Sequence, residues 1–475
     1  MIWKIYCHLA REERYDWWFI GLLLVVESFL SVAIVQHVAY TEIDWIAYMQ
    51  EVSTWWDKGE YDYRNIRGDT GPLVYPAGFL YLFQGLRYLT QEQVPPAQYV
   101  FIAFYVATQA VVLFIYQHNI KQLRQTHSIT AENPSSYSSI HLIWLWRLGM
   151  ACLCASKRLH SIFLLRLFND GPTMLLLYFS MWMFMNRRWN MGCVVFSLAV
   201  SVKMNVLLFA PGLLLLLLQE GPSLMTVFWR LALGCALPQL ILGAPFLWRF
   251  PVSYLRKAFE LDRVFFFEWT VNWKMIDEEL FVSKPWALFL LVGHLGTLVF
   301  MTMCWCRKTH RQTMGHVLWL GPARRLSPPY ICHTMLSSNF VGIVFARTLH
   351  YQFYVSTTTE YQYVHTILSI LHLAQQILAR FCAIQCWYFH AVPFLLLTSI
   401  SVSFPPKTFL QMVGIALLGL MLPITALETA FLTFPATPWS SSVLQFVHWW
   451  TLLQMRPLNP VLYDNEQDKS KKKDW

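Results

Sequence analysis

Residues 17–39 read WWFIGLLLVVESFLSVAIVQHVA, a predominantly apolar stretch of 23 residues. A helix needs about 20 apolar residues to cross the hydrocarbon core of a bilayer. Lys4, Arg11 and Arg14 precede the stretch, which gives it a superficial likeness to a secretory signal peptide. The apolar part is too long for a signal peptide and no small-residue cleavage site follows it, so we expect a retained membrane anchor.

The whole chain has the composition of a membrane protein. Of its 475 residues, 56% are hydrophobic and 13% are charged, whereas soluble domains carry about 25% charged residues. So few charges cannot cover a globular surface, and further apolar runs occur at 206–218, 286–305 and 412–422. The net charge of +9 comes from short basic clusters between apolar runs, which indicates membrane orientation rather than nucleic-acid binding.

Basic residues predict the orientation of the spans. The three bases before the first run place the N-terminus in the cytosol, and the acidic connection over residues 40–97 suits the lumen. Within it, residues 77–89 are apolar but too few to span, so we expect an interfacial helix. About twelve spans follow from this alternation; they are 17–39, 99–116, 140–155, 174–185, 193–202, 206–218, 225–246, 287–305, 328–344, 387–400 and two more after residue 407.

We therefore expect one all-α polytopic membrane domain over residues 1–455 and a cytosolic tail over residues 456–475. The tail ends in KKKDW, with Lys472 and Lys473 at the fourth and third positions from the end. This spacing is typical of the dilysine signal for retrieval to the endoplasmic reticulum. A plain solvated basic tail is the alternative.

Four predicted luminal segments are unusually rich in polar residues. They are 41–76, 156–170, 262–274 and 347–354. Glu42 and Asp44, directly after the first span, suit a general base that takes a proton from a nucleophile. Cations suit an anionic leaving group such as a phosphate. The later segments and one span end offer Lys157, Arg158, His160, Lys203, Arg347 and His350.

Several polar residues of these segments also have a structural interpretation. Arg166 and Asp170 lie four apart on one predicted helix face, so we favour a pair between them. Lys203 lies at a span end, where lysines commonly extend to the headgroups. His160 and His350 are not spaced as metal ligands, and a Glu-x-Asp pair is a weak metal signal. From charges alone, an enzyme is only slightly favoured over a transporter.

Longer motifs make the sequence more specific. They are 41–51 (TEIDWIAYMQE), 68–78 (GDTGPLVYPAG), 156–161 (SKRLHS), 165–170 (LRLFND), 201–205 (SVKMN), 269–273 (WTVNW) and 349–354 (LHYQFY). In this order, from about residue 30 to about residue 460, the chain resembles the Not56-like family of dolichyl-phosphate-mannose-dependent α-1,3-mannosyltransferases.

The resemblance implies a GT-C glycosyltransferase fold with a long first luminal loop. It implies inverting transfer of mannose from dolichyl-phosphate-mannose, a co-substrate, to Man5GlcNAc2-PP-dolichol, with no metal cofactor. By this likeness Asp44 is the base, with Glu42 as the alternate, and by analogy with related GT-C enzymes Arg347 and His350 bind the donor phosphate. The matched motifs supply the remaining predicted substrate-binding residues, which are Asp69, Tyr75, Trp269, Asn272, Tyr351 and Gln352.

The chain departs from the family pattern at residues 356–386. The family continues directly from the Phe-Tyr-Val that ends at Val355 to the Trp-Tyr-Phe-His that begins at Trp387. We interpret the intervening residues as an atypical luminal insert, and hypothesise that it is an unspliced or alternative segment. Two other functions stay open from the sequence: a lipid or sugar transporter of the same topology, and a non-catalytic subunit of a glycosylation complex.

Overall fold

The structure is a computed structural model that describes residues 2–40, 44–126, 135–154, 157–259, 266–310, 326–349, 386–403, 406–433 and 435–455. These residues are mostly helical, with one short antiparallel hairpin in which Gly68 pairs with Gly71. The elements, with 3-10 and π-helical segments labelled η, are α1 (Ile2–Arg11), α2 (Arg14–His37), α3 (Asp44–Trp56), β1 (Arg67–Gly68), β2 (Gly71–Pro72), α4 (Ala77–Thr90), α5 (Val94–Thr126), α6 (Ser135–Cys154), α7 (Lys157–His160), η1 (Ser161–Leu165), α8 (Asp170–Met185), α9 (Trp189–Val202), η2 (Met204–Phe209), α10 (Ala210–Glu220), α11 (Leu224–Trp229), η3 (Arg230–Ala236), α12 (Leu237–Arg249), α13 (Pro251–Ala258), η4 (Phe267–Trp269), α14 (Glu278–Val282), α15 (Lys284–His310), α17 (Pro328–Val344), α19 (Cys386–Ser403), α20 (Phe409–Ile415), η6 (Ala416–Met421), α21 (Leu422–Leu432) and α22 (Pro438–Gln454).

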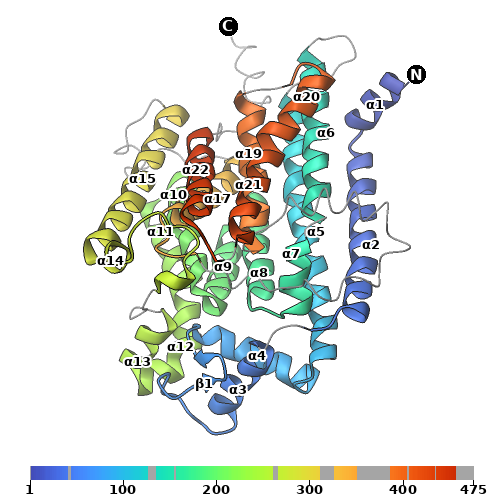
Figure 1. The fold of residues 1–475 in the computed structure, drawn as a ribbon. Helices are drawn as coiled ribbons and strands as arrows, with labels where there is room; N and C mark the ends of the chain where they lie inside the picture. Colours follow the sequence, from blue (N-terminus) through green and yellow to red (C-terminus); the bar gives the residue numbers. More distant parts are fainter. Residues whose placement is uncertain are drawn as a thin grey trace.

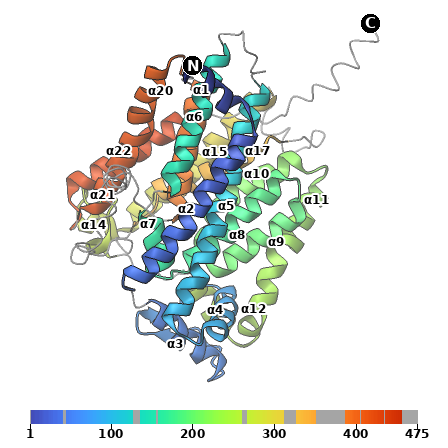
Figure 2. The same cartoon turned by 90° about the vertical axis from the view of Figure 1, so that its right-hand side faces the viewer.

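Several helices are long and apolar enough to cross a membrane. In the described part of the chain, five stretches meet this description: Arg14–His37, Val94–Gln125, Leu224–Arg249, Lys284–Cys304 and Phe409–Phe431. On α2, which packs along α5 (Figure 2), Trp18, Leu22 and Phe29 are 76%, 61% and 75% exposed. An exposed apolar face of this kind is covered by lipid. The protein is therefore a polytopic helical membrane protein.

The predicted spans coincide with helices. The span predicted at 225–246 and the first of the two after residue 407 form longer helices that include the π-helical segments η3 and η6. Three others fall in shorter apolar helices, Ser138–Cys154, Trp189–Val202 and Met204–Glu220. The all-α polytopic class is confirmed, while the number of twelve spans stays a prediction.

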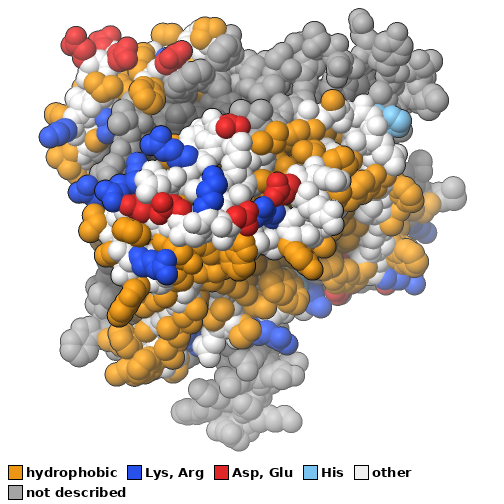
Figure 3. Space-filling view, turned by 90° about the horizontal axis from the view of Figure 1, so that it is seen from below, with side chains coloured by type: hydrophobic (Ala, Val, Ile, Leu, Met, Phe, Trp, Pro, Cys, Tyr) orange, Lys and Arg blue, Asp and Glu red, His pale blue; other side chains and the backbone are white. Residues whose placement is uncertain are grey.

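The connection between α2 and α5 folds into a layer at one end of the bundle, opposite α1 and α20 (Figure 1). This first-loop layer consists of α3, β1, β2 and α4. It shares a hydrophobic core with α5, α12 and α13, in which the ring centroids of Phe79 and Phe83 lie 4.4 Å apart and those of Tyr48 and Phe83 lie 5.0 Å apart. Viewed from this end, charged side chains gather over the layer and hydrophobic ones surround them (Figure 3).

A close crossing attaches the first-loop layer to the bundle. The helix α4, which the sequence predicted as an interfacial helix over residues 77–89, packs against α9 and α12. A Cβ atom added to Gly78 would lie 2.0 Å from Oγ of Ser201 near the end of α9. Only glycine permits this approach, so the two helices meet backbone against side chain.

At the opposite end, one buried acid holds three helices together. Asp16, at the start of α2, is fully buried and forms ion pairs with Arg124 of α5 and Arg147 of α6. Nη2 of Arg147 lies 2.6 Å from Oδ1 of Asp16 and also donates to the carbonyl oxygen of Leu9 at 2.8 Å. Nε of Arg124 donates to the carbonyl oxygen of Ala10 at 2.9 Å. The cluster therefore joins α1, α2, α5 and α6.

We predict that Asp16→Ala destabilises the protein strongly. The substitution leaves the buried Arg147 and the largely buried Arg124 without their shared acid, and breaking a buried ion pair costs about 3–5 kcal/mol. Thermal unfolding of the purified protein in detergent measures the loss. Glu12→Ala is the control, because Glu12 is half-exposed and lies 3.9 Å from Arg14, and exposed pairs contribute about 0–1 kcal/mol. Equal effects of the two substitutions would contradict the assignment.

Candidate active site

The helix α3 carries acids on the side that packs into the protein. Asp44 is its first residue, and Tyr48, Glu51 and Trp55 follow at spacings of four, three and four residues, which places them on one face of the helix. We call these four residues the inner face of α3. Tyr48, Glu51 and Trp55 are each no more than 4% exposed. The predicted base therefore begins a buried face that holds a second carboxyl group.

Tyr75 lies where this face meets the bundle. Its ring centroid is 6.0 Å from that of Tyr48. Burial raises the pKa of Tyr75, and the nearby charges of Glu51, Asp170 and Asp44 raise it further. The charges of acids from the first-loop layer and from the start of α8 thus act on one phenol, which relates predicted residues of the first and second polar segments.

Lys203 is part of the same region. It is the C-cap residue of α9, and its Nζ atom lies 2.5 Å from Oδ2 of Asp170 and 3.2 Å from Oδ1 of Asn169. Our prediction that Asp170 pairs with Arg166 was wrong. Helix spacing favoured the residue four positions earlier in the chain, but α8 lies against α9 and brings Lys203 to the acid. The predicted cation is thus positioned beside one carboxylate, that of Asp170.

Glu51 is a site residue that the sequence analysis missed. Burial raises the pKa of Glu51 to about 8, with a further contribution from the charge of Asp44. Its Oε2 atom has no hydrogen-bond partner among the described residues. A carboxyl group in this environment is protonated at neutral pH, and Asp44 is the less buried acid of the inner face. The available signal was an acid seven residues after Asp44 in an otherwise apolar helix face.

His160 lies inside the bundle. Its Nε2 atom is 2.8 Å from Oε2 of Glu27 in α2 and 3.2 Å from the hydroxyl oxygen of Tyr105 in α5. The Tyr105 hydroxyl donates to the same oxygen of Glu27 at 2.6 Å. His160 therefore links α7 to α2 and α5 in this structure. Lys157 and Arg158 precede it in α7, and their side chains lie outside the described part of the structure.

Two further predicted residues, Asn272 and Arg347, belong to segments that hydrogen bonds hold together. Nδ2 of Asn272 donates to the carbonyl oxygen of Ala346 at 2.8 Å, and its Oδ1 accepts from the backbone N–H of Leu349 at 2.9 Å. Nη2 of Arg347 donates to the carbonyl oxygens of Phe281 and Val282 at the end of α14. The third and fourth polar segments are therefore adjacent, as a shared site requires.

The other predicted site residues are distributed as follows. Asp69 lies on the opposite side of α3 from the inner face, where its Oδ2 accepts from Nε2 of Gln50 at 2.7 Å. Trp269 ends η4, and its side chain is outside the description. Glu42, His350, Tyr351 and Gln352 lie outside the described residues, as do the insert apart from Cys386 and the dilysine tail.

The fold and the site define a polytopic helical membrane protein with a cluster of acids and one lysine at one end of its bundle. Residues 21–385 match the family model described as "ALG3 protein", and the chain belongs to this family. A mouse relative is 37% identical over 99% of this chain and 93% of its own length, and a human relative is 38% identical over 98% and 92%. An Arabidopsis thaliana relative is 38% identical over 90% and 84%. All three are named "Dol-P-Man:Man(5)GlcNAc(2)-PP-Dol alpha-1,3-mannosyltransferase". The family predicted from the motifs is confirmed.

We predict that Glu51→Gln makes stability less dependent on pH. The pKa of Glu51 is higher in the folded chain, about 8, than its ordinary value of 4.5, so the folded state binds more protons between these values. The wild-type protein therefore loses stability through this group as pH rises across that window, by at most about 1.4 kcal/mol per pH unit. Glu51→Gln should gain relative to wild type towards pH 8.

Thermal unfolding in detergent across this pH range measures the difference. Glu51→Ala is the matched control, because it also removes the ionisable group but leaves a cavity. It should show the same pH dependence as Glu51→Gln with a constant loss of stability. A difference between Glu51→Gln and wild type that does not change with pH would rule out the buried neutral acid.

Proposed function

We propose that this protein transfers mannose from dolichyl-phosphate-mannose, in α-1,3 linkage, to Man5GlcNAc2-PP-dolichol and so produces the six-mannose lipid-linked precursor. The main support is that relatives of nearly the same length carry this activity in their names. The structural observations that support it best are that the charges of Asp44 and Asp170 both raise the pKa of Tyr75, and that Lys203 is paired with Asp170. An acid and a cation at one place are what sugar transfer from a phosphate requires.

The proposed reaction is a single inverting displacement. The acceptor hydroxyl oxygen attacks C1 of the donor mannose as its proton passes to the Asp44 carboxylate. The bond between C1 and the phosphate oxygen breaks, and its electron pair leaves with dolichyl phosphate. Asp44 remains the proposed base, with Glu42 as the alternate. Because Glu51 is neutral, its burial beside Asp44 adds no second negative charge.

The cationic side chains are proposed to stabilise the leaving phosphate. Lys203 is already held beside Asp170, and Lys157, Arg158, Arg347 and His350 complete the proposed set. These positive charges stabilise the negative charge that grows on the phosphate oxygens. The proposal therefore includes no metal cofactor. The donor and acceptor are the dolichol-linked partners, and both reach the site from the bilayer.

The proposed orientation places the first-loop layer in the lumen of the endoplasmic reticulum and both termini in the cytosol, with a GT-C arrangement of about twelve spans. Support comes from charge. The end of the helix bundle that holds the Asp16 cluster carries Arg124 and, from the N-terminal segment, Lys4, Arg11 and Arg14. The positive-inside rule assigns such an end to the cytosol. The opposite end, with the acids of the first loop, is then luminal.

We predict that Asp44→Asn lowers the rate of mannose transfer by about 10²- to 10⁴-fold, the usual contribution of a general base. Donor binding should persist, because the amide preserves shape and removes only basicity. The measurement is an in vitro assay with dolichyl-phosphate-mannose and Man5GlcNAc2-PP-dolichol, with the product linkage determined. Asp57→Asn is the control, since Asp57 is exposed just past the other end of α3 and pairs with Arg87.

Transfer at the wild-type rate by Asp44→Asn would remove this residue as the base. That result would favour Glu42. If neither chain transfers mannose, the result would favour a transporter or a non-catalytic subunit. Comparing the two chains in the same vesicles separates these outcomes.

A further inference from the structure

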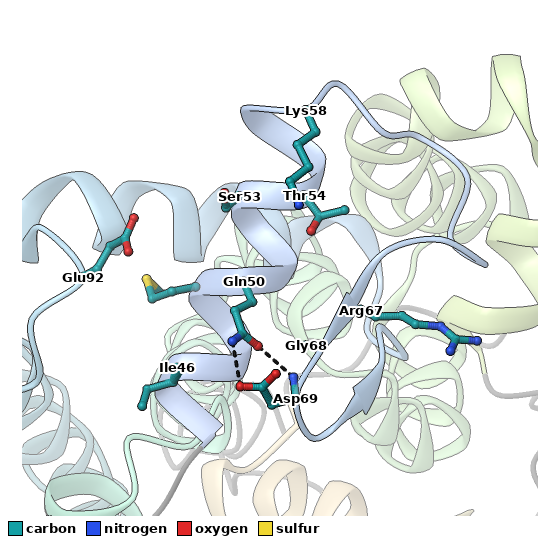
Figure 4. A pocket seen from close by; sticks show the side chains of 10 residues that line it. Ile46, Gln50, Ser53, Thr54, Lys58, Arg67, Gly68, Asp69 and Glu92 are labelled. Carbon is teal, nitrogen blue, oxygen red and sulfur yellow. Dashed lines mark hydrogen bonds between the residues drawn. The ribbon is translucent and has the colours of Figure 1, made fainter.

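A pocket of about 680 Å³ opens on the side of α3 that faces away from the inner face. We call it the outer pocket. Ile46, Gln50 and Ser53 line it from α3, Asp69 from the hairpin and Glu92 from the turn before α5 (Figure 4). None of these residues belongs to the inner face, so the outer pocket is separate from the proposed base.

The polar groups on the floor of the outer pocket are held in place before any ligand binds. Nε2 of Gln50 donates to Oδ2 of Asp69 at 2.7 Å, and the backbone N–H of Asp69 donates back to Oε1 of Gln50 at 2.7 Å (Figure 4). The hairpin lies directly on α3, because a Cβ atom on Gly68 would be 2.6 Å from the carbonyl oxygen of Ala47. Fixed donors and acceptors lower the entropy lost on binding.

The wall formed by Glu92 is also fixed. Gln91 and Glu92 both have left-handed backbone conformations, with φ of 51° and 65°, which residues other than glycine adopt infrequently. Nε of Arg87 donates to Oε1 of Glu92 at 2.6 Å, and Nε1 of Trp45 donates to its carbonyl oxygen at 2.8 Å. Two side-chain contacts thus hold an unfavourable turn in the position that forms the pocket.

The lining favours an uncharged polar ligand. Lys58 and Arg67 oppose Asp69 and Glu92, so the positive and negative charges balance. Arg67 extends away from the Gln50–Asp69 pair (Figure 4). A phosphate or another anion would meet two carboxylates here, whereas sugar hydroxyl groups both donate and accept and fit amide, carboxylate, hydroxyl and ammonium groups alike.

We propose that the outer pocket binds mannose residues of the lipid-linked acceptor that do not themselves react. This inference rests on the proposed function. The acceptor named for the relatives carries five mannose and two N-acetylglucosamine residues, of which one is attacked at Asp44. Ile46 follows Asp44 by two residues, about 3 Å along the helix axis. A sugar chain with one residue at the inner face reaches the outer pocket by passing over the start of α3.

The test compares Gln50→Ala with Gln93→Ala, a matched control at an exposed glutamine beside the pocket that does not line it. With Man5GlcNAc2-PP-dolichol, Gln50→Ala should raise the acceptor KM about 3- to 10-fold, the loss expected for one or two hydrogen bonds. The donor KM and kcat should stay at the values of Gln93→Ala. Lys58→Ala tests the same pocket without disturbing the Gln50–Asp69 pair.

The decisive comparison uses a shortened acceptor that lacks mannose residues remote from the attacked one. Wild type should bind it more weakly, and Gln50→Ala should add no further loss, because the variant and the truncation remove the same contact. Two results overturn the outer pocket while leaving the transferase intact. One is an unchanged acceptor KM in both Gln50→Ala and Lys58→Ala, and the other is an equal loss of affinity for the full and the shortened acceptor in Gln50→Ala. Failure of wild type to transfer mannose overturns the proposed function itself.

Discussion

The position of the candidate active site depends on the crossing of α4 over α9, where Gly78 lies against Ser201. Gly78 follows Tyr75 by three residues, and Ser201 precedes Lys203 by two. The contact therefore sets the depth at which the first-loop layer approaches the bundle, and so places Tyr75 opposite the pair formed by Lys203 and Asp170. A larger residue at the crossing would lift the layer and move Tyr75 away from Asp170.

Burial then decides how charge is divided within the site. Lys203 and Asp170 compensate each other at a distance of 2.5 Å, so their region carries little net charge. On the inner face of α3, the same burial keeps Glu51 protonated. Asp44, at the start of the helix and only half-buried, is left as the acid with access to a ligand. Two carboxyl groups on one helix face thus lie at different depths, and the deeper one is held neutral by burial and by the charge of the other.

The sequence predicted the apolar architecture well because hydrophobic length is a local property. The helices α2, α5 and α15 could be read directly from their runs, and Asp44 from its place after the first span. Contacts between segments far apart in the sequence were predicted less well. The partner of Asp170 proved to be Lys203, 33 residues later, and His160 was assigned to a binding role without sight of Glu27, 133 residues earlier. Glu51 was missed because its significance lies in its depth, which no spacing rule reports.

The two faces of α3 belong to one short, rigid helix. The helix has 13 residues and is therefore about 20 Å long, and its inner face is fixed in an aromatic core with Tyr48 and Trp55. A helix packed in this way moves as a rigid body, so a ligand that contacts the outer pocket also constrains Asp44. Sugars held in the outer pocket then keep the attacked residue close to the proposed base, which tightens acceptor binding. A flexible loop could carry the same acid, but it could not transmit that constraint, which gives a physical reason for the first loop to be folded.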